Sequence, residues 1–539
     1  MSRTGSCDVL VVGAGPTGLA LATQLQRFGT RFRIVDRAAD RVHESRALAI
    51  QPRTLEVLGG VGVADALVEQ GNPTVGLRLH AAGRTAGLPL FDLGGDDTAF
   101  PFLLFLSQAE TEAILAKHLV HHGVPIEREV SLVGMEQGGD RVACTLRQAS
   151  GGVERSEFRY VVGCDGAPST VREQAGIRFA GGSYPQTFVL ADLDVDGLEP
   201  GAAHVYLADA GMLFFFPLDR PAAWRLLGWP PAGTIADAEV RPTLTDLAAL
   251  VDAYAGDTLR PGEPVWSTYF RLYHRQAVAY RSGRVFVAGD AAHVHSPAGA
   301  QGMNTGIQDA WNLGWKLALV LAGQADPTLL DTYGDERQPI GRQVVRLTDR
   351  AFTIATSTSR SIRFARTRVV PRLAALAPHV PRRVRARAFR TLAQLTISYR
   401  HSAASLEGRP PLRRGPRAGD RLPDAPVEID GRATTLHQAL AAPRLHVLVV
   451  GPADTSRAGP HRISDRYPGL VEVHRLTRTP GSGALHDVTG VAHHRLGHSR
   501  ARGSAHYLVR PDGHIAYRAG GTDLAGLDVY LTRWFPPAV

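Results

Sequence analysis

The chain has 539 residues, too many for a single hydrophobic core, so the sequence predicts two or three domains. A hydrophobic content of 44% indicates an ordinary globular protein, and no apolar stretch reaches the about 20 residues that a membrane-spanning helix needs. The net charge is +9, but nearly all basic residues are arginine, which indicates the coding composition of a GC-rich genome rather than adaptation to polyanions.

The most basic stretch, residues 360–400, contains neither aspartate nor glutamate. Such a stretch could bind nucleic acid or a membrane surface, but it carries no nucleic-acid-binding motif. We therefore expect a solvated helical face, and neither nucleic acid nor a membrane as a partner.

The cysteines bear on the redox compartment. Cys7, Cys144 and Cys164 are spaced like neither a metal site nor a disulfide framework. The apolar N-terminal run carries a glycine motif, so we expect a strand there rather than a secretion signal. These features predict a cytoplasmic protein without a metal site.

The first motif begins at residue 8. Residues 8–12 are predicted to form a buried strand, and the pattern Gly13-x-Gly-x-x-Gly18 follows directly, before apolar residues at helical spacing. A second predicted strand, 32–36, ends in Asp36. Strand, glycine turn, helix and acid together are typical of a dinucleotide site. Here the first glycine allows the turn, the second lets pyrophosphate approach, the third packs helix on strand, and the acid binds a ribose hydroxyl.

The next helices carry single polar candidates. Arg53 opens a predicted helix over 53–58, where either a functional role or an ion pair with Glu56 would explain it. Ser107 is a candidate N-cap, with Glu110 completing a capping box.

Residues 160–166 predict another strand that ends in an acid and a glycine, Asp165-Gly166, with Ser169 and Arg172 opening a helix. This is not a second Gly-x-Gly-x-x-Gly pattern, so a second dinucleotide would have no binding fold of its own and would have to dock transiently. Between about 181 and 267, apolar runs separated by Gly, Asp and Pro turns predict an antiparallel sheet in a middle domain. Aromatic side chains in such a sheet could line a small-molecule pocket, although any one of them is more often sheet core or surface than a substrate contact.

The stretch 284–316 is the most informative. A short strand, 285–287, ends at Gly289-Asp290, where the carboxylate could accept a sugar hydroxyl. A loop containing Gly299 and Gly302 then feeds a helix. Backbone N–H groups and the positive end of a helix suit an anion or a ring that becomes anionic on reduction.

The stretches 13–18, 163–172 and 289–304, together with 330–341, resemble the signatures of the class A flavin-dependent monooxygenases, the para-hydroxybenzoate hydroxylase-like family. The likeness is greatest to its aromatic polyketide and phenol hydroxylase branch. It implies an α/β fold with a Rossmann-like FAD-binding domain, an inserted antiparallel-sheet substrate domain and a thioredoxin-like C-terminal domain. The implied limits are 1–180, 181–270, 271–405 with a helical linker, and 410–539. Without a cysteine after Cys164, the last domain cannot perform dithiol chemistry.

The resemblance also implies a reaction. NADPH or NADH reduces FAD, oxygen adds at the flavin C4a position, and the distal oxygen of the hydroperoxide passes to an electron-rich aromatic ring. The predicted cofactor-binding residues are Gly13, Gly15, Gly18, Asp36, Arg37, Arg46, Gln108, Asp165, Gly289, Asp290, Pro297, Gly299, Ala300, Gln301, Gly302, Met303 and Asn304, with Pro297, Gly299 and Gly302 facing the flavin. Arg172 would serve flavin and reductant binding.

The sequence predicts the substrate-binding residues less specifically than the cofactor-binding residues. The aromatic candidates of the middle sheet are His204, Tyr206, Phe214, Phe216 and Trp224. No base can be chosen among His204, His293 and His295. Besides a hydroxylase acting as monomer or homodimer on a phenolic or polyketide substrate, a Baeyer–Villiger oxygenase, a rifamycin-type hydroxylase and a non-catalytic flavoprotein stay open. A halogenase is disfavoured, because the lysine and tryptophan motifs of that family are missing.

Overall fold

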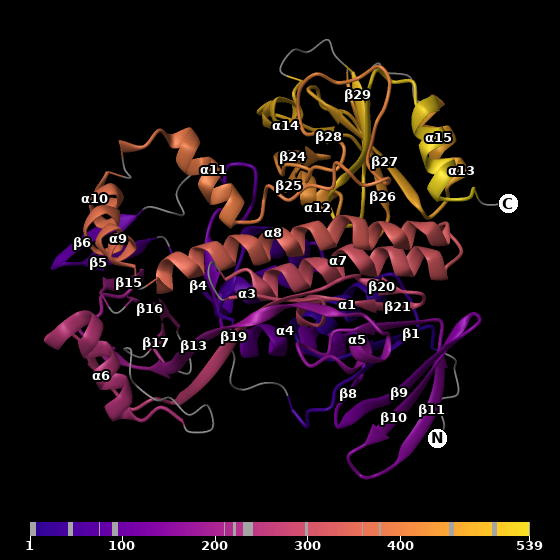
Figure 1. Ribbon diagram of the computed structural model, residues 1–539. Helices are drawn as coiled ribbons and strands as arrows, with labels where there is room; N and C mark the ends of the chain where they lie inside the picture. Colours follow the sequence, from indigo (N-terminus) through magenta and orange to yellow (C-terminus); the bar gives the residue numbers. More distant parts are fainter. Residues whose placement is uncertain are drawn as a thin grey trace.

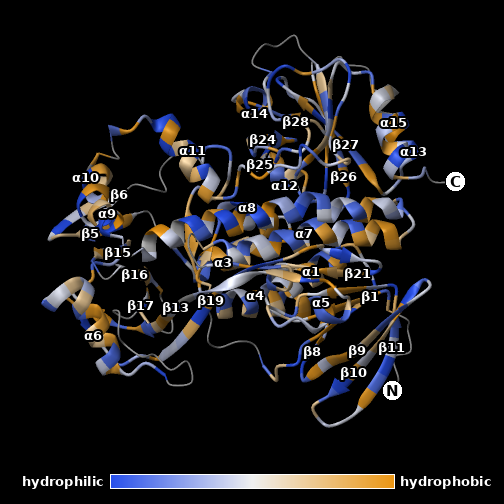
Figure 2. Ribbon diagram, in the orientation of Figure 1, coloured by the Kyte–Doolittle hydropathy of each residue, from blue (hydrophilic) through white to orange (hydrophobic). Residues whose placement is uncertain are grey.

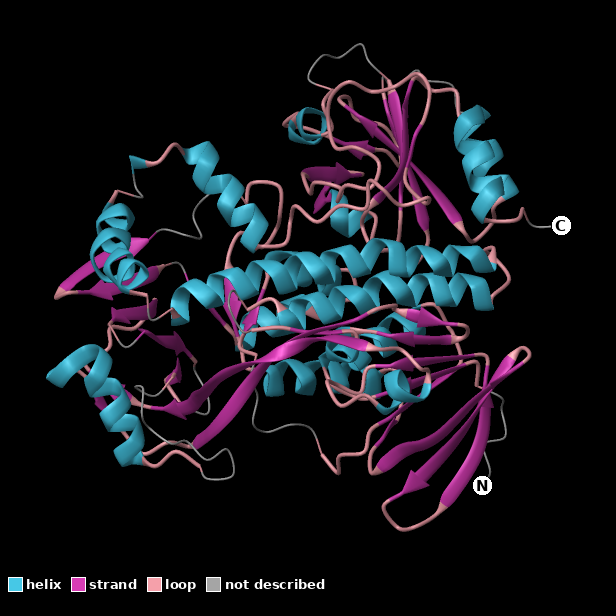
Figure 3. Cartoon of the chain, in the orientation of Figure 1, coloured by secondary structure: helices cyan, strands magenta, loops and turns pink. Residues whose placement is uncertain are grey.

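The structure is a computed structural model, drawn as a ribbon in Figure 1. Three large sheets surround a central pair of long helices (Figures 1 and 3). The structure describes residues 7–40, 47–74, 76–88, 95–209, 211–218, 222–229, 241–296, 300–357, 359–376, 379–451, 458–498 and 504–537.

The first sheet has the strand order β20-β21-β12-β1-β2-β8, and only β20 runs antiparallel to its neighbour. Val9 and Val11 pack against helices on one face, whereas Leu10 and Val12 pack on the other. A strand buried on both faces needs an apolar residue at every position, which explains the continuous apolar run. The strands are β1 (Val9–Val12), β2 (Phe32–Val35), β8 (Ile126–Glu127), β12 (Tyr160–Gly163), β20 (Arg281–Ser282) and β21 (Val285–Val287).

Helices cover one face of this sheet and a small sheet covers the other. The sequence analysis did not anticipate the small sheet, whose strands are β9 (Val130–Gly138), β10 (Arg141–Gln148) and β11 (Val153–Phe158). It packs on the main sheet beside α5 (Thr170–Gln174). The helices nearby are α1 (Pro16–Arg27), α2 (Pro52–Gly59), α3 (Ala64–Gln70) and α4 (Gln108–His121), joined by a minor sheet of β3 (Ala49–Ile50), β7 (Leu103–Phe105) and β4 (Asn72–Thr74).

The middle sheet confirms the predicted antiparallel sheet and is larger than expected. Its order is β22-β19-β13-β17-β16-β15-β5-β6, with only β15 and β5 parallel. The last two strands come from 77–88, outside the predicted middle domain, because an edge strand joins a sheet through backbone bonds that leave little sequence signal. The strands are β5 (Leu77–Ala81), β6 (Arg84–Leu88), β13 (Phe179–Leu193), β15 (Ala203–Ala208), β16 (Gly211–Pro217), β17 (Trp224–Gly228), β19 (Trp266–Ala277) and β22 (His293–Val294).

One face of the middle sheet packs on α6 (Leu244–Ala255), whose N-terminus carries a capping box between Thr243 and Asp246. Two further strands, β14 (Val195–Asp196) and β18 (Arg260–Pro261), pair beside it. Along β16, Leu213 and Phe215 are fully buried while Phe214 and Phe216 are half-buried. This alternation places the two sets on opposite faces.

The helix pair consists of α7 (Gly302–Leu321) and α8 (Asp331–Thr356). Hydrophilic and hydrophobic residues alternate along α8, as expected for a helix with one buried face (Figure 2). The arginine-rich stretch that follows is helical as predicted, in α9 (Arg360–Phe364), the π-helical turn Ala365–Val369, α10 (Val370–Ala375) and α11 (Arg382–Leu392).

The C-terminal domain is an eight-stranded sheet that lies on the helix pair (Figure 1, yellow). The predicted strand at 445–450 and the hairpin at 505–517 are confirmed. Its strands are β23 (Leu406–Glu407), β24 (Pro426–Ile429), β25 (Arg432–Thr435), β26 (Leu445–Val450), β27 (Val471–Thr477), β28 (Leu485–His486), β29 (Ala505–Val509) and β30 (Ile515–Gly520), and its helices are α12 (Leu436–Ala439), α13 (Ala458–Arg466), α14 (Val491–Arg495) and α15 (Ala525–Trp534).

Candidate functional site

The three glycine-containing turns lie together. A Cβ atom placed on Gly13 would stand 2.3 Å from the carbonyl oxygen of Cys164, and one on Gly289 would stand 2.3 Å from Oγ1 of Thr17. Their turns follow β1, β12 and β21, adjacent parallel strands whose carboxyl ends share one edge of the sheet. Such an edge is where open α/β sheets bind nucleotides.

The glycines of the first turn differ in what surrounds them. Gly13 has φ +102°, which a side chain rarely adopts, and Gly18 lies so close that its Cβ would meet the Gly13 carbonyl at 1.9 Å. Gly15 is different, because its Cβ would meet nothing nearer than Oε1 of Glu112 at 4.0 Å. The open space before Gly15 is the cradle that an approaching pyrophosphate requires, so the residues fit the group predicted there.

Two helices begin at this place without a side-chain cap. In the described part of the chain, neither the N-cap of α1 (Gly15) nor that of α7 (Gln301) makes a side-chain capping bond, and neither first turn contains an acid. In contrast, Ser107 caps α4 by accepting a hydrogen bond from the backbone N–H of Glu110, which confirms the predicted N-cap. The N–H groups and positive ends of α1 and α7 can therefore serve an anionic ligand.

Asp36 holds the first turn in place. Its Oδ2 accepts a hydrogen bond from the N–H of Ala14 at 2.6 Å, and its Oδ1 accepts one from Ala38 at 2.8 Å. The exposed Arg37 follows it. Asp36 thus stands at the end of β2 beside the glycine turn, where a ribose carboxylate is expected.

Asp165 and Arg172 shape the second turn. Ser169 Oγ donates to Asp165 Oδ1 at 2.5 Å and the N–H of Val171 donates to Oδ2, so this carboxylate organises the start of α5. Burial raises the pKa of Asp165 above its ordinary value. Arg172 is buried, donates to the carbonyl of Ala291 at 3.0 Å and lies 4.0 Å from the ring centre of Phe179. In this structure Arg172 ties the second turn to the third.

The third turn leads into α7. Asn304 donates to the carbonyls of Ala49 and Ala300 and accepts from the N–H of Gln51, each at 2.8 Å, so it fixes the start of α7 against β3. Ala300 has φ +52° and Met303 is buried. The predicted residues Arg46, Pro297 and Gly299 lie outside the described residues.

Gln108 is linked to the space beside Gly15 through Glu112. Its Nε2 donates to Oε1 of Glu112 at 2.8 Å, and the carboxylate of Glu112 is the nearest atom to the position a Gly15 Cβ would take. Glu112 was not predicted as a site residue. The sequence contained a signal for it, because Glu112 follows the predicted Gln108 by four residues, and residues four apart lie on one face of a helix.

Asp309 is the other site residue that the sequence analysis missed. It is fully buried and accepts hydrogen bonds from the N–H of Gly289 at 3.1 Å, from His293 Nε2 at 2.7 Å and from Arg337 Nε at 2.6 Å. Burial alone would raise its pKa, but Arg337 and His293 outweigh burial and hold the pKa below its ordinary value. This anion fixes the backbone of the glycine–aspartate turn.

The candidate bases differ in their surroundings. His293 is fully buried and bonded to Asp309. Burial lowers the pKa of His295 to about 4, and its ring lies near Gly302. Burial, with a smaller contribution from Arg78, also lowers the pKa of His204 to about 4.

The predicted aromatic residues are split between the two faces of the middle sheet. Tyr206 and Trp224 pack with α6, and His204, whose ring meets Trp224 edge-on, bonds to His80 and to the carbonyl of Glu199. The opposite face carries the other two: Phe214 stacks on Phe216 at 5.8 Å, and Phe216 stacks on Phe105 of β7 at 5.9 Å. Phe105 lies just before Ser107 and Gln108, so this aromatic strip connects the middle sheet to the region of the glycine turns.

A buried ion pair lies on the same face as the strip. Arg225 donates to both carboxylate oxygens of Asp192 at 2.6 Å and to the carbonyl of Ala47 at 3.2 Å. It holds the middle sheet against the segment that precedes β3. This pair could not be predicted from the sequence, because β13 and β17 come together only in the sheet.

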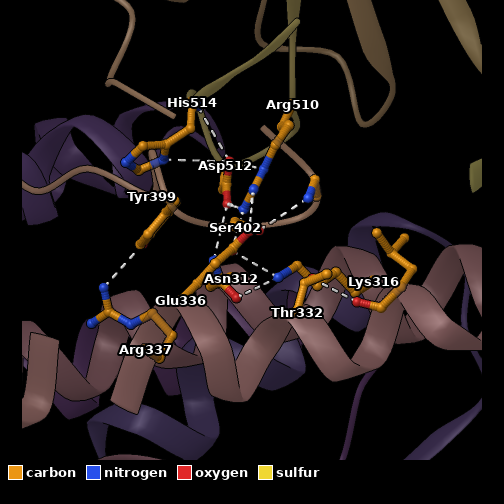
Figure 4. A network of polar contacts seen from close by, with 12 residues as sticks. Asn312, Lys316, Thr332, Glu336, Arg337, Tyr399, Ser402, Arg510, Asp512 and His514 are labelled. Carbon is orange, nitrogen blue, oxygen red and sulfur yellow. Dashed lines mark hydrogen bonds and ion pairs between the residues drawn. The ribbon is translucent and has the colours of Figure 1, made fainter. Parts of the chain in front are cut away.

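Polar contacts continue from Arg337, the partner of Asp309, to the C-terminal domain (Figure 4). Arg337 also donates to Tyr399 Oη at 3.0 Å, and the Tyr399 ring packs on His514 at 4.3 Å. Nearby, the carboxylate of Glu336 in α8 accepts hydrogen bonds from two guanidinium nitrogens of Arg510, at 2.7 and 2.8 Å, and from the Lys316 ammonium at 2.8 Å. The C-terminal domain is thus joined to α7 and α8 by buried charges rather than by an apolar surface alone.

Arg53 belongs to a second such contact. It forms the predicted ion pair with Glu56 at 3.0 Å, but it also donates to the backbone carbonyl of Asp512. Glu56 in turn pairs with Arg421 of the C-terminal domain. The ion pair that was one of the two explanations for Arg53 is therefore confirmed, and Arg53 also holds the C-terminal domain in place.

A separate hollow of about 440 Å³ lies at the opposite end of the first sheet, among Arg159, Tyr160, Arg281 and Arg284. These residues stand at the amino ends of β12 and β21, away from the turns. In the described residues, no helix is both long enough and apolar enough to cross a bilayer.

Comparisons with known proteins agree with this geometry. Residues 6–348 match the family described as FAD binding domain, and residues 415–538 match the family described as aromatic-ring hydroxylase, C-terminal. The chain is 38% identical over 528 residues to 6-methylpretetramide 4-monooxygenase from Streptomyces rimosus, covering 96% of this chain and 92% of that protein.

Two solved structures show the same architecture along the whole chain. An anhydrotetracycline hydroxylase from Streptomyces rimosus is 30% identical with a TM-score of 0.77, covering 99% of this chain and 100% of the other. Aklavinone-11 hydroxylase, solved with FAD and aklavinone, is 29% identical with a TM-score of 0.77, covering 99% of both chains. The three converging turns, the middle sheet and the C-terminal domain thus place this chain in the family of FAD-dependent aromatic monooxygenases, enzymes that use NAD(P)H as co-substrate.

Proposed function

We propose that this enzyme hydroxylates a flat, polycyclic aromatic polyketide. The observation that carries the proposal is the aromatic strip of Phe214, Phe216 and Phe105, which leads from the middle sheet toward the glycine turns. Stacked faces suit a fused-ring substrate, because aromatic rings attract one another in offset or parallel arrangements. The relatives named above act on compounds of this class.

The residues have distinct proposed roles toward FAD. Gly15 and the start of α1 would receive the pyrophosphate, and Asp36 would bind the adenosine ribose. Asp290 would bind a hydroxyl of the flavin side, with Gln108 beside the dinucleotide. The start of α7, from Ala300 to Asn304, would face the ring.

When bound, FAD supplies the electron transfer and the oxygen activation. The protein contributes orientation and charge. N–H donors and the positive end of α7 need no reorganisation when negative charge develops near them. Asp309 keeps the glycine–aspartate turn fixed, since it accepts the Gly289 N–H while it also accepts hydrogen bonds from Arg337 and His293.

The test is a screen for substrate-dependent NADPH or NADH oxidation with linear and angular fused-ring phenols, single-ring phenols and rifamycins. We expect stimulation by the fused-ring phenols and a product that gains one oxygen atom as a ring hydroxyl. Stimulation only by rifamycins, or by simple phenols, would contradict the substrate class. A lactone product from a ring ketone would instead assign the Baeyer–Villiger outcome.

The chain is divided into domains. For the domains we propose the limits predicted from the sequence, 1–180, 181–270, 271–405 and 410–539. Strands β5 and β6 join the middle sheet from the first part, and the end of β19 and all of β22 join it from the third. We also propose cytoplasmic localisation, since NAD(P)H is a cytoplasmic co-substrate, and a monomer or homodimer in solution.

A further inference from the structure

Two strands of the C-terminal domain bring together three side chains that the oxygenase chemistry does not use. His446 of β26 lies opposite Glu472 of the parallel strand β27, and His474 follows two positions later on the same face. In the described residues, this is the one group of three or more His, Cys, Asp or Glu side chains whose possible ligand atoms all lie within 4.8 Å of one another.

The two imidazoles already stand at nearly the separation that a metal ion requires. His446 Nδ1 lies 3.0 Å from His474 Nε2, and a Glu472 carboxylate oxygen lies 3.8 Å from the same His474 nitrogen. Bonds of about 2.0–2.1 Å at the tetrahedral angle separate two nitrogen ligands by roughly 3.3 Å. A shift of a few tenths of an ångström would therefore admit an ion between them.

The outer contact of His446 sets its ring for coordination. His446 Nε2 lies 3.0 Å from the carbonyl oxygen of Ala442, so Nε2 carries the proton. The Nδ1 lone pair is then directed at the cluster. A metal-bound histidine characteristically donates its other N–H to a carbonyl or a carboxylate in this way.

The charges around the cluster are mixed. Glu472 supplies the one carboxylate among the three ligands and is 41% exposed, which leaves it able to turn toward an ion. Arg444 lies 3.7 Å from the Glu472 carboxylate and competes with a cation for it. His446 itself is fully buried, so the nitrogen that faces the cluster is shielded from bulk water.

We infer that His446, Glu472 and His474 form a binding site for one divalent transition-metal ion, of the zinc type, with a fourth position open to water. Two nitrogens and one carboxylate oxygen match the ligand preference of zinc. The ion would link β26 to β27. Sequence analysis predicted no metal site because it considered cysteine spacing, whereas the signal here is Glu-x-His on one strand with a histidine on its neighbour.

The test uses the untagged, FAD-loaded protein after treatment with EDTA, titrated with ZnCl₂ and followed by elemental analysis and calorimetry. The wild type is expected to bind one zinc ion per chain, with a rise in the Tm of the C-terminal domain. His474→Ala and Glu472→Gln should each bind zinc at least about 100-fold more weakly, on the scale of lost metal contacts. Both side chains are partly exposed, so we expect the two variants to fold. An unchanged FAD content verifies this.

His486→Ala is the matched control, since His486 is a half-buried histidine 3.7 Å from Glu428 in the same sheet. It should bind zinc as the wild type does. The inference is overturned if the wild type binds no stoichiometric zinc, or if His474→Ala binds it as tightly as the wild type. Equal losses in His474→Ala and His486→Ala would also overturn it, because they would indicate non-specific binding to histidines.

Discussion

Gly15→Ala separates cofactor binding from folding. Gly15 occupies ordinary extended backbone at φ −76°, and an added Cβ would meet no protein atom nearer than 4.0 Å. The apoprotein should therefore lose at most about 1 kcal/mol, the cost of alanine at a helix N-cap. The methyl group would instead enter the space assigned to the pyrophosphate.

The expected loss of FAD affinity follows from the cost of forcing a methyl group into the space that the pyrophosphate fills. Overpacking of this kind costs about 1–3 kcal/mol, which corresponds to FAD binding that is roughly 5- to 150-fold weaker. FAD fluorescence quenching on titration of the apoprotein measures the affinity, and thermal unfolding of the apoprotein measures stability.

Two other glycines serve as controls. Gly138→Ala, at a position with no atom within 4 Å of the new Cβ, should leave both quantities unchanged. Gly13→Ala should impair folding itself, because φ is +102° and the Cβ would stand 2.3 Å from the Cys164 carbonyl. Folded Gly15→Ala apoprotein that binds FAD as tightly as the wild type would refute the assignment of this turn to the pyrophosphate.

Three further predictions follow from the same geometry. Asp290→Ala should weaken FAD binding by about 1–3 kcal/mol, the scale of a lost charge-assisted hydrogen bond; unchanged affinity in the fluorescence titration would remove the assigned contact. Phe214→Leu should raise the KM for the aromatic substrate with little loss of stability. Phe215→Leu, on the α6 face, should instead lower the free energy of unfolding by about 1–3 kcal/mol without changing KM. The reverse pattern in steady-state kinetics and urea unfolding would contradict the placement of the pocket. Glu336→Gln should destabilise the protein by about 3–5 kcal/mol, since Arg510 and Lys316 would keep buried charges without their partner. Burial alone would raise the pKa of Glu336, but Arg510 and Lys316 outweigh burial and lower that pKa. The stability that the Glu336 ion pairs contribute is therefore present above the unfolded pKa and is lost as the pH falls below about 4.5. Urea unfolding between pH 6 and about 3 should show a steeper loss of stability in the wild type than in the variant.

The parts of the site that sequence analysis predicted are those whose signal is local. A strand, a glycine turn and a helix start within about ten residues at 8–18 specify one another through backbone conformation and burial. The same is true of the strand at 285–287 and of the Ser107 cap, both of which the structure contains.

The parts that were missed depend on distant partners. Asp309 is one of several polar residues of α7, and only its contacts with Gly289, His293 and Arg337 in the folded chain distinguish it from the others. Arg225 and Asp192 pair only because β13 and β17 are neighbours in the sheet. A single sequence does not contain these pairings, since each residue alone fits many surroundings.

The separation of the middle-sheet aromatics shows the same limit. Alternation along a strand predicts two faces, but it does not tell which face meets the cofactor domain. The packing of α6 decides this, because it covers Tyr206 and Trp224 and leaves Phe214 and Phe216 for the other side.

The most direct measurement is a crystal structure of the protein with bound FAD. We expect one FAD per chain, with its pyrophosphate at Gly15 and the start of α1, a ribose hydroxyl on Asp36 and the flavin at the start of α7. FAD bound elsewhere, or a pyrophosphate that contacts neither Gly15 nor α1, would contradict it.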